Sequence, residues 1–192
     1  MSLSILRSDV AACTVCPDLP LGPRPVVQIG AGARLVIIGQ APGTKVHASG
    51  VPWDDDSGDR LREWLGIPRE VFYDPERVAL VPMGFCYPGR KGDGDAPPRP
   101  ECAPQWHERV LAAMPQIELT LLVGMYAQKA YLGKRRKKTL TATVQSWLEY
   151  APDYLPTVHP TWRSRIWMKK NPWFEADVLP DLRARVARAT QR

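Results

Sequence analysis

Four short apolar runs, each ended by glycine, proline or histidine, constrain the fold of this chain more than any other feature. They span residues 35–38, 77–82, 119–124 and 154–158. Each is long enough for one buried strand, and helix-like segments separate them. Apolar strands joined by helices form parallel sheets that are covered on both faces. The sequence therefore predicts an α/β fold with three layers, α/β/α, around a central, mostly parallel four-stranded sheet.

Composition places the chain among single-domain globular proteins. Its 192 residues, 44% of them hydrophobic, suit one domain over residues 1–192 with a sizeable core. It has no run of eighteen apolar residues, no signal-peptide pattern and no repeat, so we expect a cytoplasmic monomer that does not enter a membrane. The net charge of +6 favours a polyanionic partner, most simply DNA. The alternative is a mildly basic enzyme whose charge serves solubility.

The predicted strands end in turns that place the candidate site. In open parallel sheets, ligands bind beyond the carboxyl ends of the strands. The first turn has glycines that let backbone approach a ligand closely, and it comprises Gly39, Gln40, Ala41, Pro42 and Gly43. A polar loop follows, with Trp53, three carboxylates at 54–56, and Ser57-Gly58 at the start of an amphipathic helix. On this stretch alone, a turn that binds nucleotide phosphate is the alternative.

The motifs GQAPG, Pro52-Trp53 followed by Ser57-Gly58, and His159-Pro160-Thr161 occur in that order. In this the chain resembles the uracil-DNA glycosylase superfamily over roughly residues 13–180, as a distant relative of its four-cysteine iron–sulfur branches, the four-type and the five-type. The resemblance implies a uracil-DNA glycosylase-like fold and a monofunctional DNA N-glycosylase. Its substrate would be a deaminated base, uracil first, flipped out of DNA. A non-catalytic protein that binds damaged or single-stranded DNA on this fold is the alternative.

The resemblance also implies catalytic roles. Cleavage leaves an oxocarbenium-like sugar and an anionic base, so the site needs a carboxylate, hydrogen-bond donors and an aromatic face. Asp55 matches the aspartate two residues before Ser-Gly in the five-type branch, while Asp56 is the candidate helix cap. His159 would lie beside the base oxygen, with a sheet-capping histidine as the alternative. Gln40 would orient water or contact the base. Trp53 would stack on the base, with an ordinary core tryptophan as the alternative.

The stretch after His159 carries the predicted DNA contacts. In the family, the loop after this motif enters the minor groove, so Trp162 or Arg163 would fill the gap left by the extruded base. Residues 163–170 interleave cations with aromatic and apolar side chains, which favours phosphate contacts combined with stacking. The predicted DNA-binding residues are Thr161, Trp162, Arg163, Arg165, Lys169 and Lys170.

One position departs from the family pattern. The iron–sulfur branches carry a base-reading asparagine ahead of the third cysteine, and Pro82 occupies that position here. Base reading would then depend on Gln40, on the backbone amides of residues 83–85, or on Asn171, the single asparagine of the chain. A site without the paired amide discriminates less between bases, so another deaminated base such as hypoxanthine is also considered.

All four cysteines fall into two groups, Cys13-x2-Cys16 and Cys86-x15-Cys102. Four thiols with one tight pair favour a metal site over disulfides, with four unrelated buried thiols as the alternative. Cysteine-only ligation suits an iron–sulfur cluster or structural zinc. The family resemblance implies a [4Fe–4S] cluster on Cys13, Cys16, Cys86 and Cys102. We expect it to tie the N-terminal segment to the loop over residues 86–102.

Overall fold

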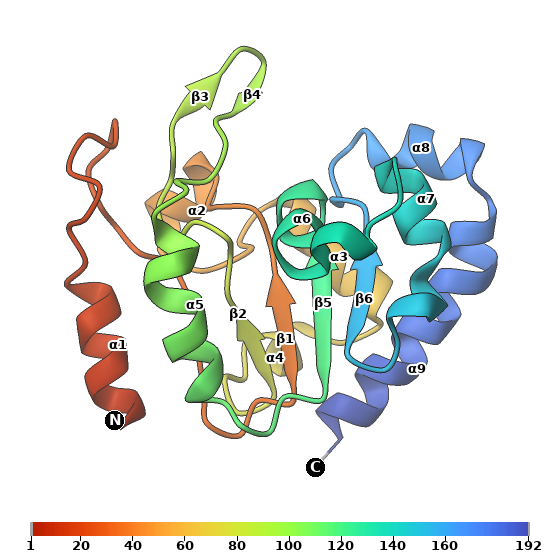
Figure 1. Ribbon diagram of the computed structural model, residues 1–192, viewed down its shortest axis with the longest axis horizontal. Coiled ribbons are helices and arrows are strands. Elements are labelled where there is room, and N and C mark those ends of the chain that lie inside the picture. The colour runs from red at the N-terminus through yellow and green to blue at the C-terminus, as the bar shows by residue number, and fades with distance from the viewer. Residues whose placement is uncertain (1, 192) are drawn as a thin grey trace.

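The computed structural model describes residues 2–191, and a four-stranded parallel sheet lies at its centre (Figure 1). The strand order is β2-β1-β5-β6, and the strands are β1 (Leu35–Ile38), β2 (Val78–Leu80), β5 (Leu119–Val123) and β6 (Tyr154–Thr157). In the register, Leu35 of β1 lies opposite Val78 on one side and Leu119 on the other. Each strand lies within its predicted range, so the predicted parallel sheet is confirmed.

Helices cover both faces of the sheet. They are α1 (Leu3–Ala11), α2 (Thr44–Ser49), α3 (Asp56–Leu65), α4 (Arg69–Phe72), α5 (Cys102–Ala112), α6 (Met125–Leu132), α7 (Leu140–Gln145), α8 (Ser164–Lys170) and α9 (Leu179–Thr190). Shorter helical segments are η1 (Gly133–Arg135), η2 (Trp147–Tyr150) and the π-helix η3 (Phe174–Val178). None of the helices within residues 2–191 has the length and apolar character needed to span a membrane.

Strand β1 shows how the three layers arise. Its alternate side chains point to opposite faces of the sheet, and all four of its residues are buried. Leu35 and Ile37 belong to one apolar cluster with α3 and α9. Val36 and Ile38 belong to a second cluster with α1, α5 and α6. The central strand is therefore apolar throughout because both of its faces are covered.

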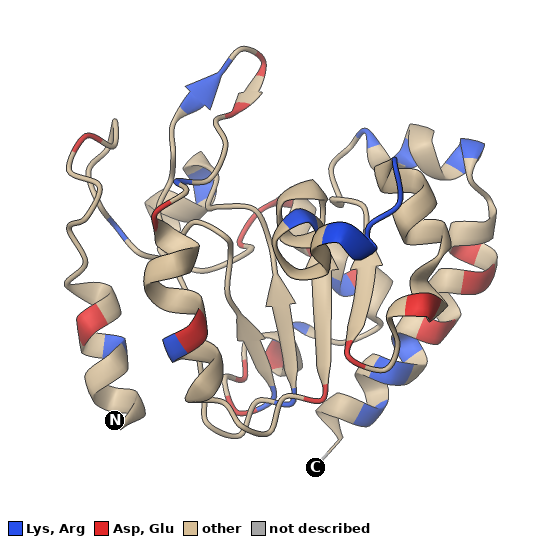
Figure 2. Cartoon of the chain, in the orientation of Figure 1, with Lys and Arg blue, Asp and Glu red and all other residues tan. Residues whose placement is uncertain are grey.

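The main difference from the sequence prediction is a small hairpin within residues 86–102, which we expected to form a loop. Strands β3 (Arg90–Lys91) and β4 (Gly94–Asp95) pair antiparallel, with Arg90 opposite Asp95. Gly92 adopts φ +60° at the first position of the two-residue turn, which suits a type II′ hairpin. The hairpin projects beyond the carboxyl ends of the central strands (Figure 1), and both of its cations lie on β3 (Figure 2).

Candidate active site

A cavity of about 570 Å³ is formed by loops that follow three of the central strands. Residues 39–43 line it after β1, Pro82 after β2, and His159 with residues 161–163 after β6. Turns from distant parts of the chain therefore converge on one cavity at the carboxyl end of the sheet. The predicted site residues that line it are Gly39, Gln40, Ala41, Pro42, Gly43, Trp53, Asp55, His159, Thr161, Trp162 and Arg163.

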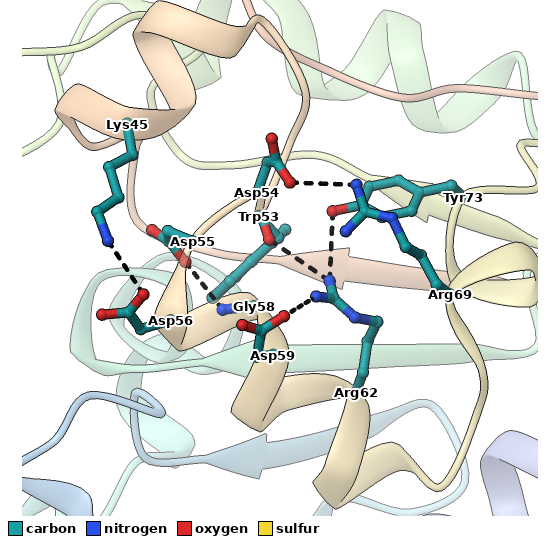
Figure 3. A network of polar contacts seen from close by, with 10 residues as sticks. All are labelled: Lys45, Trp53, Asp54, Asp55, Asp56, Gly58, Asp59, Arg62, Arg69 and Tyr73. Carbon is teal, nitrogen blue, oxygen red and sulfur yellow. Dashed lines mark hydrogen bonds and ion pairs between the residues drawn. The ribbon is translucent and has the colours of Figure 1, made fainter.

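The three consecutive carboxylates have different partners (Figure 3). Asp55 is the N-cap of α3, and its Oδ1 accepts the Gly58 N–H at 2.8 Å. The expectation that Asp56 caps this helix is therefore wrong, because the extended backbone of Asp55 aims its side chain back at the first turn. Asp56 is 89% exposed and pairs with Lys45 at 3.0 Å. Asp54 pairs with Arg69 at 3.1 Å and does not line the cavity.

The backbone of Trp53 is held in an unusual conformation. Its φ of +58° lies in the left-handed region, which is uncommon for a bulky residue and is frequent at functional sites. A Cβ on Gly58 would lie 1.8 Å from the Trp53 carbonyl oxygen, so only glycine fits at that position. The buried Arg62 donates to the same carbonyl at 3.5 Å and also pairs with Asp59 (Figure 3). The first turn of α3 thus fixes Trp53.

The indole of Trp53 lies between the first and last turns of the site. It stacks on the His159 ring with 5.4 Å between centroids and 28° between planes. A Cβ on Gly39 would lie 2.8 Å from Trp53 Cζ2, so the turn after β1 must carry glycine for the indole to approach. Trp53 also packs against the core cluster of α3 and α9, so it is at once a core residue and a lining residue of the cavity.

His159 is neutral in this environment. Burial lowers the pKa of the imidazole from 6.5 to about 4, and the nearby Asp55 carboxylate opposes that shift only in part. The Nδ1 atom is buried and has no hydrogen-bond partner within residues 2–191. A buried polar atom without a partner is costly, by about 1–3 kcal/mol, so this atom is suited to a partner that arrives with a ligand.

The wall of the cavity after β2 offers no backbone donors. Pro82 has no N–H, and the N–H groups of residues 83–85 donate to Gly39 O, Gln40 O and Cys102 Sγ at 2.9, 3.0 and 3.2 Å. The idea that these amides read a base is therefore wrong, because they extend the hydrogen bonding of the sheet and hold a cysteine. Among the three proposed base readers, this leaves Gln40 and Asn171.

Asn171 does not reach the cavity. It ends α8, and its side-chain amide donates to the Trp167 carbonyl at 2.8 Å. The hypothesis that Asn171 moves into the base pocket is not supported by this geometry, because its amide satisfies the last turn of its own helix. Gln40 is the candidate that remains, since it lines the cavity and its side chain makes no hydrogen bond within the described residues.

The family model of the uracil DNA glycosylase superfamily matches residues 27–183 of the sequence, which is most of the chain. The chain belongs to this superfamily. Its members are generally hydrolytic DNA glycosylases, which indicates DNA repair glycosylase activity for this chain and DNA as the molecule on which it acts. The match includes the turns after β1 and β6, Cys86 and Cys102, and it excludes Cys13 and Cys16.

The predicted DNA contacts of this superfamily member divide into two sets. Thr161, Trp162 and Arg163 line the cavity rim, where Trp162 is 65% exposed and carries the Arg163 guanidinium 5.1 Å from its ring centroid. Arg165, Lys169 and Lys170 lie on α8 outside the cavity lining, and their side chains are exposed. The structure therefore places the candidate wedge beside the cavity and the remaining cations along the adjacent helix.

Sequence reasoning missed several lining residues of this glycosylase-family cavity. Arg60 of α3 lines it and donates to the Pro160 carbonyl at 3.3 Å, which ties the carboxylate loop to the histidine loop. Residues 93–95 of the hairpin line it from the other side. Burial, with a smaller contribution from Asp55, raises the pKa of Asp95. Nothing in the sequence around the hairpin signals this contact, because it depends on how the loop folds over the sheet.

A second unpredicted residue supports the wall after β2. His107 of α5 is buried, and its Nε2 lies 2.9 Å from the Pro82 carbonyl while its Nδ1 lies 2.6 Å from the Tyr131 hydroxyl. Burial lowers the pKa of His107. The neutral ring therefore donates from Nε2 to the Pro82 carbonyl and accepts from Tyr131. This pair of hydrogen bonds fixes Pro82 at the cavity wall.

The four cysteines come together away from the cavity. Cys13, Cys16, Cys86 and Cys102 all line one hollow, with largely apolar surroundings. Burial raises the pKa of the Cys102 thiol to about 12 and raises those of Cys16 and Cys86 as well. Within residues 2–191, no three or more His, Cys, Asp or Glu side chains are arranged to hold a metal ion. The structure thus brings the four thiols to one hollow without forming a site for a single ion.

Proposed function

We propose that this chain is a monofunctional DNA glycosylase that hydrolyses the N-glycosidic bond of a deaminated base, uracil first, flipped out of DNA. The observation that carries the proposal is that Asp55 and His159, from loops far apart in sequence, line one cavity around the ring of Trp53. A carboxylate and a neutral imidazole on a shared cavity match the two charges that develop when the bond breaks.

In this mechanism the C1′–N bond breaks and its electron pair leaves with the base. The sugar becomes oxocarbenium-like, and water then adds to C1′ and loses a proton. The Oδ1 atom of Asp55 is engaged by the Gly58 N–H, while its Oδ2 makes no hydrogen bond within residues 2–191. Oδ2 is thus free to stabilise the cationic sugar and to accept the proton of the attacking water.

His159 would act on the other product of the cleavage. Because its ring is neutral, it has one N–H to donate to a base oxygen on which negative charge develops. The free Nδ1 atom and the cavity-facing position support this role. Gln40 would read the base, since its amide both donates to a carbonyl and accepts from an N–H, the pair of groups that uracil and hypoxanthine share.

Hydrolysis without strand cleavage is part of the proposal. A glycosylase that also nicks the strand needs an amine to form a Schiff base with C1′. None of the described residues that line the cavity is a lysine, and Lys45 is paired with Asp56. The described residues that line the cavity therefore supply no lysine amine to attack C1′, and water is the nucleophile of the proposed reaction.

We also propose that the four cysteines hold a [4Fe–4S] cluster with a structural role. The donor set fits, because four thiols line one hollow and the Phe85 N–H donates to Cys102 Sγ, as is common around cluster ligands. Structural zinc on the same four thiols is the alternative, because cysteine-only ligation suits both groups. When bound, the cluster would have a structural role and no part in the reaction, because it would join the loop after α1 to the loop after β2 and to the start of α5.

A non-catalytic DNA-binding protein is the second candidate function. Pro82 and the engaged amides of residues 83–85 favour it, because they leave the base-reading wall without a donor. Release of free base separates the two candidates. Uracil, hypoxanthine and xanthine are placed at one position of the same oligonucleotide, single- and double-stranded, and free base and abasic sites are quantified. Release of one of them supports the enzyme, and binding without release from any substrate supports the second candidate.

A further inference from the structure

The densest run of charge in the chain has no role in the proposed reaction. Residues 134–138, Lys-Arg-Arg-Lys-Lys, connect α6 to α7 and lie outside the cavity. In Figure 2 this segment rises to the start of α7, near α8 and at the same end of the sheet as the cavity. Five successive cations usually form a solvated loop, so a further role requires that some of them hold the segment in place and that others are left unpaired.

Two of the five cations hold the segment in place. Lys137 pairs with the Glu149 carboxylate, and Arg135 donates to the Glu149 carbonyl at 3.2 Å while lying over the Tyr150 ring. The side chains of Lys134 and Lys138 are exposed and make no hydrogen bond or ion pair within residues 2–191. The segment therefore presents two free ammonium groups on an anchored backbone, which is more favourable for binding than a mobile tail.

This basic segment is linked to α8 through α7. The Trp167 indole N–H of α8 donates to Thr141 Oγ1 of α7 at 2.9 Å, and the Lys137 N–H donates to Thr143 Oγ1 at 3.1 Å. The start of α7 is thus fixed both to the basic segment and to α8. Helix α8 begins beside the cavity rim and adds its own exposed cations, Arg165, Lys169 and Lys170.

We propose that Lys134 and Lys138 extend the DNA-binding surface beyond α8 and bind backbone phosphates of the duplex that flanks the flipped nucleotide. The proposal rests on the proposed function, because the cavity sets where the duplex lies. Free cations on a fixed surface suit the regular phosphates of a duplex and carry no base preference. The surface thus serves affinity and positioning, while the cavity serves chemistry.

The test compares the variant Lys134→Gln/Lys138→Gln with wild type and with Arg188→Gln, an exposed cation on α9 with no hydrogen bond or ion pair in the described chain. Dissociation constants are measured between low and physiological salt on duplexes of about 10 and about 25 base pairs with a central lesion. On the longer duplex the double variant is expected to bind roughly 10-fold more weakly, with a salt slope smaller by about 1–2. On the shorter duplex its loss is expected to be smaller. Arg188→Gln should change neither.

The outcomes separate this proposal from the proposed function. Single-turnover base release at saturating duplex should be unchanged in the double variant, because neither lysine touches the cavity. An unchanged salt slope, or an equal loss on both duplex lengths, would overturn the phosphate surface. A greater loss on single-stranded RNA than on duplex DNA would also overturn it. If wild type releases no base from any substrate but the slope still changes, the glycosylase assignment fails and the surface stands.

Discussion

Asp55 combines two interactions that substitution can separate. One oxygen caps α3 through the Gly58 N–H, and the other is free at the cavity. Asparagine keeps an oxygen that accepts this hydrogen bond, and it is as good an N-cap as aspartate. Alanine removes the cap and the carboxylate together. The pair Asp55→Asn and Asp55→Ala therefore measures stability and chemistry independently at one position.

The magnitudes follow from the two roles. Both variants lose the charge, so their difference in stability is the cap itself, about 1 kcal/mol. In a domain of this size, that difference should place the melting temperature of the alanine variant about 2–4 °C below that of the asparagine variant. Both should lose the catalytic carboxylate and with it about 10²–10⁴-fold in the rate of base release.

The assay is single-turnover release of free base from a uracil-containing oligonucleotide, with thermal unfolding recorded on the same preparations. Asp54→Asn is the matched control, because it makes the same charge change one residue away at a pair with Arg69 outside the cavity. It should keep the wild-type rate. An asparagine variant at full rate would refute the assignment of Asp55 as the catalytic carboxylate. Equal melting temperatures for the two Asp55 variants would refute the cap.

Three further predictions concern other parts of the site. The folded-state pKa of His159, about 4, lies below its ordinary 6.5. As the pH falls, this imidazole is therefore protonated in the unfolded chain before it is protonated in the folded protein. The free energy of unfolding should fall by about 2 kcal/mol between pH 7.5 and pH 5. Urea unfolding at both pH values checks this, and His159→Gln should show a smaller fall; an equal fall would contradict it. Gly58→Ala should lower the free energy of unfolding by about 1–3 kcal/mol, because its Cβ would displace the Trp53 carbonyl. An unchanged free energy of unfolding in urea would contradict this. Protein purified without oxygen should be coloured and contain iron and sulfide, Cys102→Ala should lose both, and a colourless protein with one zinc per chain would rule out the cluster.

The sequence predicted the sheet and the family because both depend on local patterns. The run at residues 35–38 is apolar at every position, and such a run is compatible with few environments other than a strand buried on both faces. The superfamily was predicted from turns such as residues 39–43, where Gly39 is required by the close approach of the Trp53 indole. Each of these features is a short stretch of sequence, so it could be recognised without coordinates.

The tertiary structure decided which groups are free to act. The sequence could not show that Asp55 and not Asp56 caps α3, that the amides of residues 83–85 are already bonded, or that Asn171 satisfies its own helix. Each of these depends on a hydrogen bond whose partner is fixed by backbone direction or by a strand distant in sequence. The residue types set what chemistry is available to this protein, whereas the folded backbone sets which polar atoms remain unbonded and face the cavity.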